Sequence, residues 1–265
     1  MDTEFLNALE KVMEAAEREA AQLILHAGGI LAESKTGNRD VVTEYDRRVQ
    51  ELVVQRLREF LPDAGFVKEE SDAHDALNGE HVFIIDPIDG TMNFVHHFHH
   101  SAISVAYASR GELLAGCVYN PYLDEMFSAI KGQGAFLNGR PIHADTAPLR
   151  ETFFCFGTSP YYPELTDETF RLARIAFGAS LDLRRTASAA LDLCYVAAGR
   201  VGLFFEIRLN LWDYAAGILI AEEAGSKVCT LDGGAVPVSL EKSSIVAGGR
   251  QALEDFMELI GKEVG

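Results

Sequence analysis

The stretch Asp86-Pro87-Ile88-Asp89-Gly90-Thr91-Met92-Asn93-Phe94 follows the short apolar run at 81–85. Such a run predicts a buried strand, so two carboxylates three residues apart lie where that strand ends. Pro87 stiffens the exit, and both carboxylates together with the Ile88 carbonyl can turn toward one point. These oxygen ligands suit Mg²⁺ better than zinc. A helix starting at Gly90-Thr91 would add free N–H groups for a phosphate, although an Asp-Pro turn with an Asx cap explains the spacing as well.

Two other acidic segments are candidates for the same site. Glu69-Glu70 follows a stretch with few hydrophobic residues, where adjacent like charges usually form a solvated face. Asp213 lies at the start of an apolar helix predicted to run to about Ala224, where an aspartate is often the N-cap. A cap and a metal ligand are not exclusive, so both interpretations of Asp213 stay open.

The composition excludes several classes of protein. The chain has 265 residues, of which 48% are hydrophobic, as in an ordinary globular protein of one or two domains. No window approaches the ~18 apolar residues of a membrane span. The acidic N-terminus does not have the layout of a signal peptide, and the cysteines are widely separated. We therefore expect a cytoplasmic protein that does not bind a membrane.

The chain is strongly acidic. Lys and Arg number 23 against 40 Asp and Glu, which gives a formal charge of −17. This charge disfavours nucleic acid as a partner, because its binding needs Lys and Arg at the phosphates. An anionic small substrate would need a local positive charge, and a divalent metal is the usual source.

Helical and strand patterns mix along the chain, which predicts layered helices and sheets of the α/β class. Helices are expected at 4–27, 44–60, 168–177, 188–198, 213–224 and 251–260. Strands are expected at 81–85, 102–108, 113–119, 125–130, 153–156, 201–205 and 244–247, and residues 33–40 indicate a loop or hairpin. We expect a single domain over 1–265 with a soft subdivision near 150, into an N-terminal half (1–150) and a C-terminal half (151–265).

Five segments together resemble the inositol monophosphatase family of Mg²⁺-dependent, Li⁺-sensitive sugar-phosphate phosphatases. They are Asp40-Val41-Val42-Thr43-Glu44-Tyr45-Asp46, Glu69-Glu70-Ser71, the stretch 86–94, Ser188-Ala189-Ala190-Leu191-Asp192-Leu193-Cys194 and Trp212-Asp213-Tyr214-Ala215-Ala216-Gly217. Each motif is weak alone, but all of them occur in the family's order over about residues 5–250. The resemblance implies an alternating α-β-α-β-α sandwich and, for most members, a homodimer.

The resemblance also implies two or three Mg²⁺ ions in each subunit. Glu69, Asp86 and the Ile88 carbonyl would bind one ion. Asp86, Asp89 and Asp213 would bind a second, and a third, weaker ion would lie near Glu69. A cluster of carboxylates such as this is electrostatically unfavourable without a cation.

Catalytic and substrate-binding roles follow from the same resemblance. Thr91, held by Asp46 and near Glu69, would orient the attacking water. Glu206 would accept hydrogen bonds from substrate hydroxyls, and Lys35 would lie in a loop that closes over the site. The residues implied to contact the substrate are Asp89, Gly90, Thr91, Ser188, Ala189, Glu206 and Asp213.

Three positions depart from the family pattern. Ala187 and Arg208 stand where the family usually has glycine, and Gly202 stands where many members have aspartate. Ala187 and Arg208 lie near the expected substrate site, so these changes leave the substrate open. Fructose 1,6-bisphosphate or 3′-phosphoadenosine 5′-phosphate are alternatives, and Arg184, Arg185 and Arg208 are then candidates to bind a second phosphate.

The histidines His96, His97, His99 and His100 surround Phe98. Such a cluster can bind soft metals, but partial burial or a dimer contact is the favoured interpretation. A non-catalytic regulatory protein on the same scaffold would be expected to have lost a metal ligand, and none is lost here. The sequence therefore predicts a Mg²⁺-dependent phosphate monoester hydrolase that acts on inositol monophosphate or a related polyol or sugar phosphate.

Overall fold

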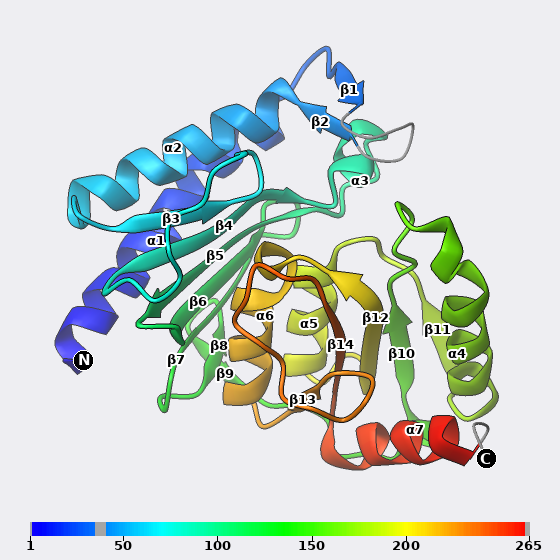
Figure 1. The fold of residues 1–265 in the computed structure, drawn as a ribbon. Coiled ribbons are helices and arrows are strands. Elements are labelled where there is room, and N and C mark those ends of the chain that lie inside the picture. Colours follow the sequence, from blue (N-terminus) through cyan, green and yellow to red (C-terminus); the bar gives the residue numbers. More distant parts are fainter. Residues whose placement is uncertain (1, 35–40, 263–265) are drawn as a thin grey trace.

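The computed structural model describes residues 2–34 and 41–262 (Figure 1). Its helices are α1 (Thr3–Leu25), α2 (Glu44–Phe60), α3 (Thr91–Val95), α4 (Thr166–Gly178), α5 (Ala189–Ala197), α6 (Leu211–Glu223) and α7 (Arg250–Lys262). Short 3₁₀ turns lie at Leu149–Glu151 and Pro163–Leu165. No described helix is long and apolar enough to cross a membrane.

The first large sheet is built by the part of the chain before residue 150. Its strands, in spatial order, are β3 (Gly65–Lys68), β4 (Val82–Asp89), β5 (Ala102–Ser109), β6 (Glu112–Asn120), β7 (Glu125–Ile130), β8 (Ala135–Leu137) and β9 (Arg140–Ile142). Only the β3–β4 pair is parallel among these neighbours. The strands β1 (Ala32–Ser34) and β2 (Val41–Thr43) pair separately as an antiparallel ladder.

The second large sheet is built by the part of the chain after residue 150. Its spatial order is β11 (Asp182–Arg184), β10 (Phe153–Phe156), β12 (Leu203–Leu209), β14 (Ser243–Gly248) and β13 (Lys227–Cys229). The strand β10 is parallel to both of its neighbours, whereas β14 is antiparallel to β12 and β13.

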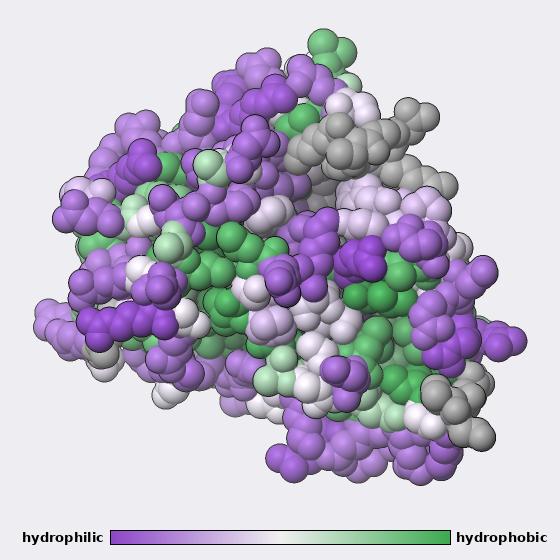
Figure 2. Space-filling view, viewed as in Figure 1, coloured by the Kyte–Doolittle hydropathy of each residue, from purple (hydrophilic) through white to green (hydrophobic). Residues whose placement is uncertain are grey.

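The helices and sheets alternate in layers (Figure 1). The pair α1 and α2 packs on one face of the first sheet, and α5 and α6 lie between the two large sheets. Helices α4 and α7 cover the far face of the second sheet. Hydrophilic side chains cover the outer surfaces of α2 and α7 (Figure 2), as amphipathic helices require. The predicted α-β-α-β-α sandwich is confirmed.

Most of the predicted elements are present, and the ends of three of them differ clearly from the prediction. Strand β4 does not end at Ile85; it continues to Asp89, with an irregularity in its pairing to β5 between Asp86 and Asp89. Strand β12 continues to Leu209 and not only to Phe205. Helix α6 begins at Leu211, so Asp213 lies in its first turn and Asn210 is the N-cap. The short strands β3, β8, β9, β11 and β13 were not predicted.

The N-terminus of α2 is fixed by a capping box. Thr43 is the N-cap, and its side chain accepts hydrogen bonds from the backbone N–H groups of Tyr45 and Asp46. Asp46 completes a capping box by accepting from the Thr43 N–H at 2.7 Å. Lys35 and Asp40 lie outside the described residues, so the expected loop over the site is not assessed.

Gly202 precedes β12 at a point where no side chain fits. A Cβ atom at this position would lie 2.2 Å from Cγ2 of Thr152, which is itself buried in front of β10. The Gly202 N–H donates to the Phe153 carbonyl at 2.9 Å, so the backbone cannot easily move away. This contact leaves no room here for the aspartate that the family pattern would place at position 202.

We expect Gly202→Ala to lower the free energy of unfolding by about 1–3 kcal/mol, because overpacking forces Thr152 or the backbone to shift. Urea denaturation measures the change. Adding Thr152→Ala to this variant removes the closest atom and is expected to restore part of the loss. Equal stability of Gly202→Ala and the wild type would contradict the steric explanation.

Candidate metal and phosphate site

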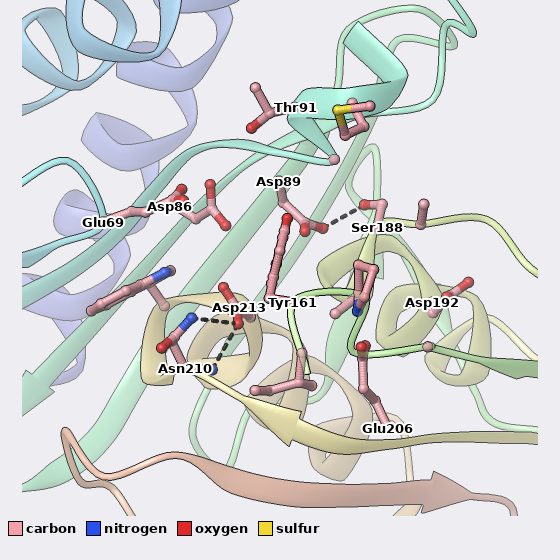
Figure 3. Close-up of a pocket in the computed structure, with 18 of the residues that line it drawn as sticks. Glu69, Asp86, Asp89, Thr91, Tyr161, Ser188, Asp192, Glu206, Asn210 and Asp213 are labelled. Carbon is pink, nitrogen blue, oxygen red and sulfur yellow. Dashed lines mark hydrogen bonds between the residues drawn. The ribbon is translucent and has the colours of Figure 1, made fainter. Parts of the chain in front are cut away.

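A cavity of about 570 Å³ opens where the loops of the two halves of the chain meet (Figure 3). It is lined by the ends of β4 and β12 and by the first residues of α3, α5 and α6. The carboxylates among the lining residues are Glu69, Asp86, Asp89, Asp192, Glu206 and Asp213. Segments far apart in the sequence therefore contribute acidic side chains to one enclosure.

Asp86 and Asp89 come from the irregular end of β4. Burial raises the pKa of Asp86 well above its usual value, and the negative charge of Glu69 adds to this effect. Burial also raises the pKa of Asp89 to about 6, although hydrogen bonds to its carboxylate oppose the rise. Burial therefore opposes full ionisation of these two carboxyl groups.

Asp89 is held by the first turn of α5. The Ser188 hydroxyl donates to Asp89 Oδ2 at 2.5 Å, and the Ala190 N–H donates to the same oxygen at 2.9 Å. Ser188 is also the N-cap of α5. Ser188 and Ala189 both line the cavity, so the structure places both of these predicted substrate contacts beside Asp89.

Asp213 is fixed by the N-terminus of α6. Its Oδ2 accepts from the Asn210 N–H at 2.7 Å and from the Asn210 side-chain amide at 3.2 Å (Figure 3). This capping box leaves Oδ1 for another partner. Burial raises the pKa of Asp213 well above its usual value, and Glu69 contributes further.

Glu69 follows β3 and is placed by the backbone. Its N–H donates to the Ile85 carbonyl at 3.1 Å, which extends the β3–β4 pairing toward the cavity. The next residue, Glu70, is bracketed by Gln50, whose amide donates to the Glu70 carbonyl at 2.9 Å and accepts from its N–H at 3.0 Å. Gln50 was not among the predicted site residues. The sequence marks it only as a polar residue on the buried face of α2.

Thr91 connects the cavity to α2. Its hydroxyl lies 3.0 Å from the Ile88 carbonyl and 3.2 Å from Asp46 Oδ1, and it can donate to either. Asp46 is fully buried, and its other oxygen accepts from the Thr43 hydroxyl at 2.5 Å. Burial raises the pKa of Asp46 above its usual value, although the bonds from Thr43 oppose the rise.

Gly90 forms the turn between β4 and α3. Its φ of +88° lies in the left-handed region, which glycine adopts without a steric penalty. A Cβ at this position would lie 3.0 Å from the Ala187 carbonyl oxygen and 3.1 Å from that of His100. The turn is therefore packed tightly against the segment that precedes α5.

Glu206 and Asp192 form the opposite wall of the cavity (Figure 3). Glu206 accepts from the Ser159 N–H at 2.8 Å, and burial raises its pKa to about 7. Asp192 accepts from the Thr186 hydroxyl at 2.7 Å, and burial raises its pKa to about 8. Asp192 was not among the predicted site residues. In the sequence it is a single acidic residue in an apolar helix, a pattern that does not indicate a site.

Ala187 has a φ of +66°, an uncommon conformation for a residue with a side chain. Asn93 holds the adjacent backbone by donating to the Thr186 carbonyl at 2.7 Å and to the His100 carbonyl at 2.6 Å. The segment between β11 and α5 is thus fixed in the geometry that presents Ser188 to Asp89. Alanine in place of glycine at position 187 therefore introduces backbone strain.

The arginines proposed for a second phosphate are not all at the cavity. Arg208 pairs with Glu164 at 3.1 Å and is not a lining residue, and Arg184 pairs with Asp182 at 2.7 Å. Only Arg185 of the three lines the cavity. The direction of a long side chain depends on its local partners, which the sequence pattern does not reveal.

The histidine cluster is mostly exposed. His96, His97 and His99 are exposed and only His100 is partly buried, so the expected partial burial holds for one of them. The His99 ring stacks on Tyr122 with the ring centroids 5.0 Å apart. Within residues 2–34 and 41–262, no three His, Cys, Asp or Glu side chains are already close enough together to hold a metal ion.

The donor set of the cavity nevertheless fits Mg²⁺. Asp86, Asp89 and Asp213 offer hard oxygen ligands. A bound cation would offset the cost of burying their charges and relieve the repulsion that adds to the raised pKa values of Asp86 and Asp213. The exposed histidines offer no such enclosure.

Comparison with known proteins shows which family the chain resembles. The model of the inositol monophosphatase family matches residues 3–264. The fructose-1,6-bisphosphatase/inositol-1-monophosphatase of Thermotoga maritima is 40% identical over 213 residues, 80% of each chain. The Nus factor SuhB of Escherichia coli is 38% identical over 206 residues, 76% of each chain. A solved IMPase structure from Thermotoga maritima superimposes with a TM-score of 0.87 at 33% identity, covering 97% of this chain and 98% of that one.

We expect Ala187→Gly to raise the free energy of unfolding by about 1 kcal/mol. Glycine removes the penalty of the left-handed conformation, which is about 1–2 kcal/mol for other residues, and part of this gain is offset by its greater freedom in the unfolded chain. Urea denaturation at fixed pH without added metal measures the effect. A loss of stability would show that the alanine methyl group makes packing contacts that outweigh the strain.

Asp192 makes the stability depend on pH. Its pKa of about 8 in the folded state exceeds the usual 3.8 of the unfolded state, so the folded state binds the extra proton between these values. The free energy of unfolding must then fall as the pH rises through this interval. In metal-free buffer at pH 5, 6, 7 and 8, we expect Asp192→Asn to fall less steeply than the wild type. Parallel curves would contradict the assignment.

Proposed function

Because the chain belongs to the inositol monophosphatase family and is a phosphatase, we propose that it hydrolyses phosphate monoesters of inositol, or of a related polyol or sugar, with Mg²⁺. The observation that supports this most is the meeting of Asp86, Asp89 and Asp213 in one buried cavity. The net charge of the chain is −17, so an acidic cavity in it would repel a phosphate unless cations bind there as well.

We propose the Mg²⁺ ligands that the resemblance to the family implies. Glu69, Asp86 and the Ile88 carbonyl would hold one Mg²⁺, and Asp86, Asp89 and Asp213 a second, with a weaker third ion near Glu69. Bound Mg²⁺ would neutralise the phosphate oxygens, lower the pKa of a coordinated water and stabilise the leaving oxygen. Ser188 and Asn210 keep two of these carboxylates in place through the hydrogen bonds described above.

Thr91 would orient the attacking water. Because its hydroxyl donates its proton to the Ile88 carbonyl or to Asp46, its oxygen can accept a hydrogen bond from that water. A water held this way directs its own lone pair toward the phosphorus. Glu69 lines the same cavity and would accept a second hydrogen bond from that water.

The remaining lining residues would bind the substrate. The Gly90 and Thr91 N–H groups at the start of α3 would donate to phosphate oxygens. On the opposite wall, Glu206 would accept hydrogen bonds from substrate hydroxyls, and it gains charge for this as the pH passes about 7. Ala189 also lines the cavity and would contact the substrate.

The alternatives differ in substrate or in class. A bisphosphatase would use the same metal ligands, and the Thermotoga maritima relative is named for both activities. A non-catalytic protein would not need Thr91, Asp46 and Glu69 arranged around one acidic cavity. We propose a cytoplasmic homodimer, organised as one domain with its soft subdivision near residue 150.

The test is phosphate release with and without Mg²⁺. The panel holds inositol 1-phosphate, glycerol 2-phosphate, fructose 1,6-bisphosphate, histidinol phosphate and 3′-phosphoadenosine 5′-phosphate. We expect Mg²⁺-dependent release that Asp89→Asn reduces by more than about 100-fold, because a ligand and its placement are lost together. Asp63→Asn makes the same chemical change at an exposed turn and should retain full activity. Release that persists in Asp89→Asn, or in EDTA, would contradict the proposal.

A further inference from the structure

The buried face of α2 carries two polar residues among its apolar ones. The buried residues of this helix are Asp46, Val49, Gln50, Val53 and Leu57. The three apolar side chains pack in the layer between α2 and the first sheet, whereas Asp46 and Gln50 lie one helical turn apart in the first half of the helix. Burying a carboxylate or an amide is unfavourable unless protein hydrogen bonds replace those made to water. The partners of these two side chains therefore explain why they are buried.

Both side chains bond to segments of the proposed Mg²⁺ site. Asp46 Oδ1 lies 3.2 Å from the Thr91 hydroxyl. Gln50 donates from its side-chain amide to the Glu70 carbonyl at 2.9 Å, and its Oε1 accepts from the Glu70 N–H at 3.0 Å. Thr91 and Glu69, the residue before Glu70, both line the cavity (Figure 3). One helix therefore reaches the two groups proposed to hold the attacking water.

Gln50 holds the backbone on the side of Glu69 that leads away from β3. On the strand side, the Glu69 N–H donates to the Ile85 carbonyl at 3.1 Å. Beyond Glu70 the chain leaves the sheet for a largely exposed loop, where strand pairing no longer fixes it. The two hydrogen bonds of Gln50 engage both peptide groups of Glu70. They thus limit the rotation of the backbone from which the Glu69 side chain extends to the cavity.

An amide is suited to this place because it carries no charge. Burial raises the pKa of Asp46, and the negative charge of Glu70 adds to the rise. A carboxylate at position 50 would bring one more negative charge to this group. An apolar residue would leave the Glu70 N–H and carbonyl without these partners, which is costly for groups that water reaches poorly. Glutamine supplies a donor and an acceptor on one neutral side chain.

We propose that Gln50 is a positioning residue of the Mg²⁺ site, which acts through the backbone of Glu70 to hold the Glu69 carboxylate where it binds a cation and accepts a hydrogen bond from the attacking water. This inference rests on the proposed function and adds a residue to the groups that support it. Replacing a side chain that orients a metal ligand typically costs about 10–100-fold in metal affinity or activity. The first two turns of α2 are then part of the site, although neither Asp46 nor Gln50 lines the cavity.

The test compares the wild type with Gln50→Met, which keeps the length of the side chain and removes both hydrogen bonds. Isothermal titration calorimetry without substrate measures the dissociation constant for Mg²⁺, and we expect it to rise at least about tenfold. At saturating Mg²⁺ we expect kcat for the best substrate of the panel to fall about tenfold with little change in KM, because the attacking water and not the phosphate loses its partner. Gln50→Asn keeps the amide on a shorter side chain and should raise the dissociation constant less, so it carries the test if Gln50→Met does not fold.

Two control variants separate positioning from a loss of stability. Gln55→Met makes the same chemical change on the exposed face of α2. Val53→Ala weakens the packing of the same helix, because Val53 is fully buried and its side chain forms no hydrogen bond. Urea denaturation measures the stability of each variant. We expect both controls to keep the wild-type affinity for Mg²⁺, although Val53→Ala is less stable.

An unchanged dissociation constant in the Gln50 variants, or an equal rise in Val53→Ala, would overturn the inference and leave the proposed function intact. A wild type that binds Mg²⁺ but releases no phosphate from any compound of the panel would overturn the proposed function instead. In that case the dissociation constants alone decide on Gln50. A wild type that does not bind Mg²⁺ would overturn both.

Discussion

Burying like charges in one cavity is the constraint on which the rest of this structure depends. Asp86, Asp89 and Asp213 are held within a single enclosure, where burial raises the pKa of each and the charge of Glu69 adds to the rise at Asp86 and Asp213. Such a group of carboxylates is tolerated where other bonds fix each member and where a cation can enter. The Ser188 hydroxyl bound to Asp89 and the Asn210 amides bound to Asp213 are bonds of this kind. The site is thus built by the starts of α5 and α6 as much as by β4.

The central layer of helices can fix these carboxylates because both large sheets pack on it. Helices α5 and α6 lie between the sheets, so their N-termini can meet the end of β4 on one side and the end of β12 on the other. The Asn93 side chain then ties α3 to the segment before α5. The strained backbone of Ala187 within that segment shows that the position of Ser188 is maintained against a local cost.

The sequence predicted the long elements and the identity of the acidic site residues, for different reasons. Long apolar runs and the Thr43 cap carry their own signals, whereas β3, β11 and β13 are three or four residues long and depend on neighbouring strands for their hydrogen bonds. The end of β4 was misjudged because Asp86 and Asp89 are typical of a turn. Gln50 and Asp192 were missed because only the folded chain shows what they face. The wrong expectation for Arg208 has the same origin, since Glu164 and Tyr162 set its direction.

If Mg²⁺ completes the acidic cavity, the cation must stabilise the folded chain. The thermal stability of the chain therefore tests this role of Mg²⁺ without any assay of activity. A cation that binds only the folded state stabilises it by RT ln(1 + [L]/Kd). The measurement is the Tm of the wild type and of Asp86→Asn over a titration of Mg²⁺ at fixed ionic strength. We expect a Tm that rises with Mg²⁺ in the wild type and rises much less in Asp86→Asn. A wild-type Tm that does not respond to Mg²⁺, or an equal rise in both proteins, would contradict it.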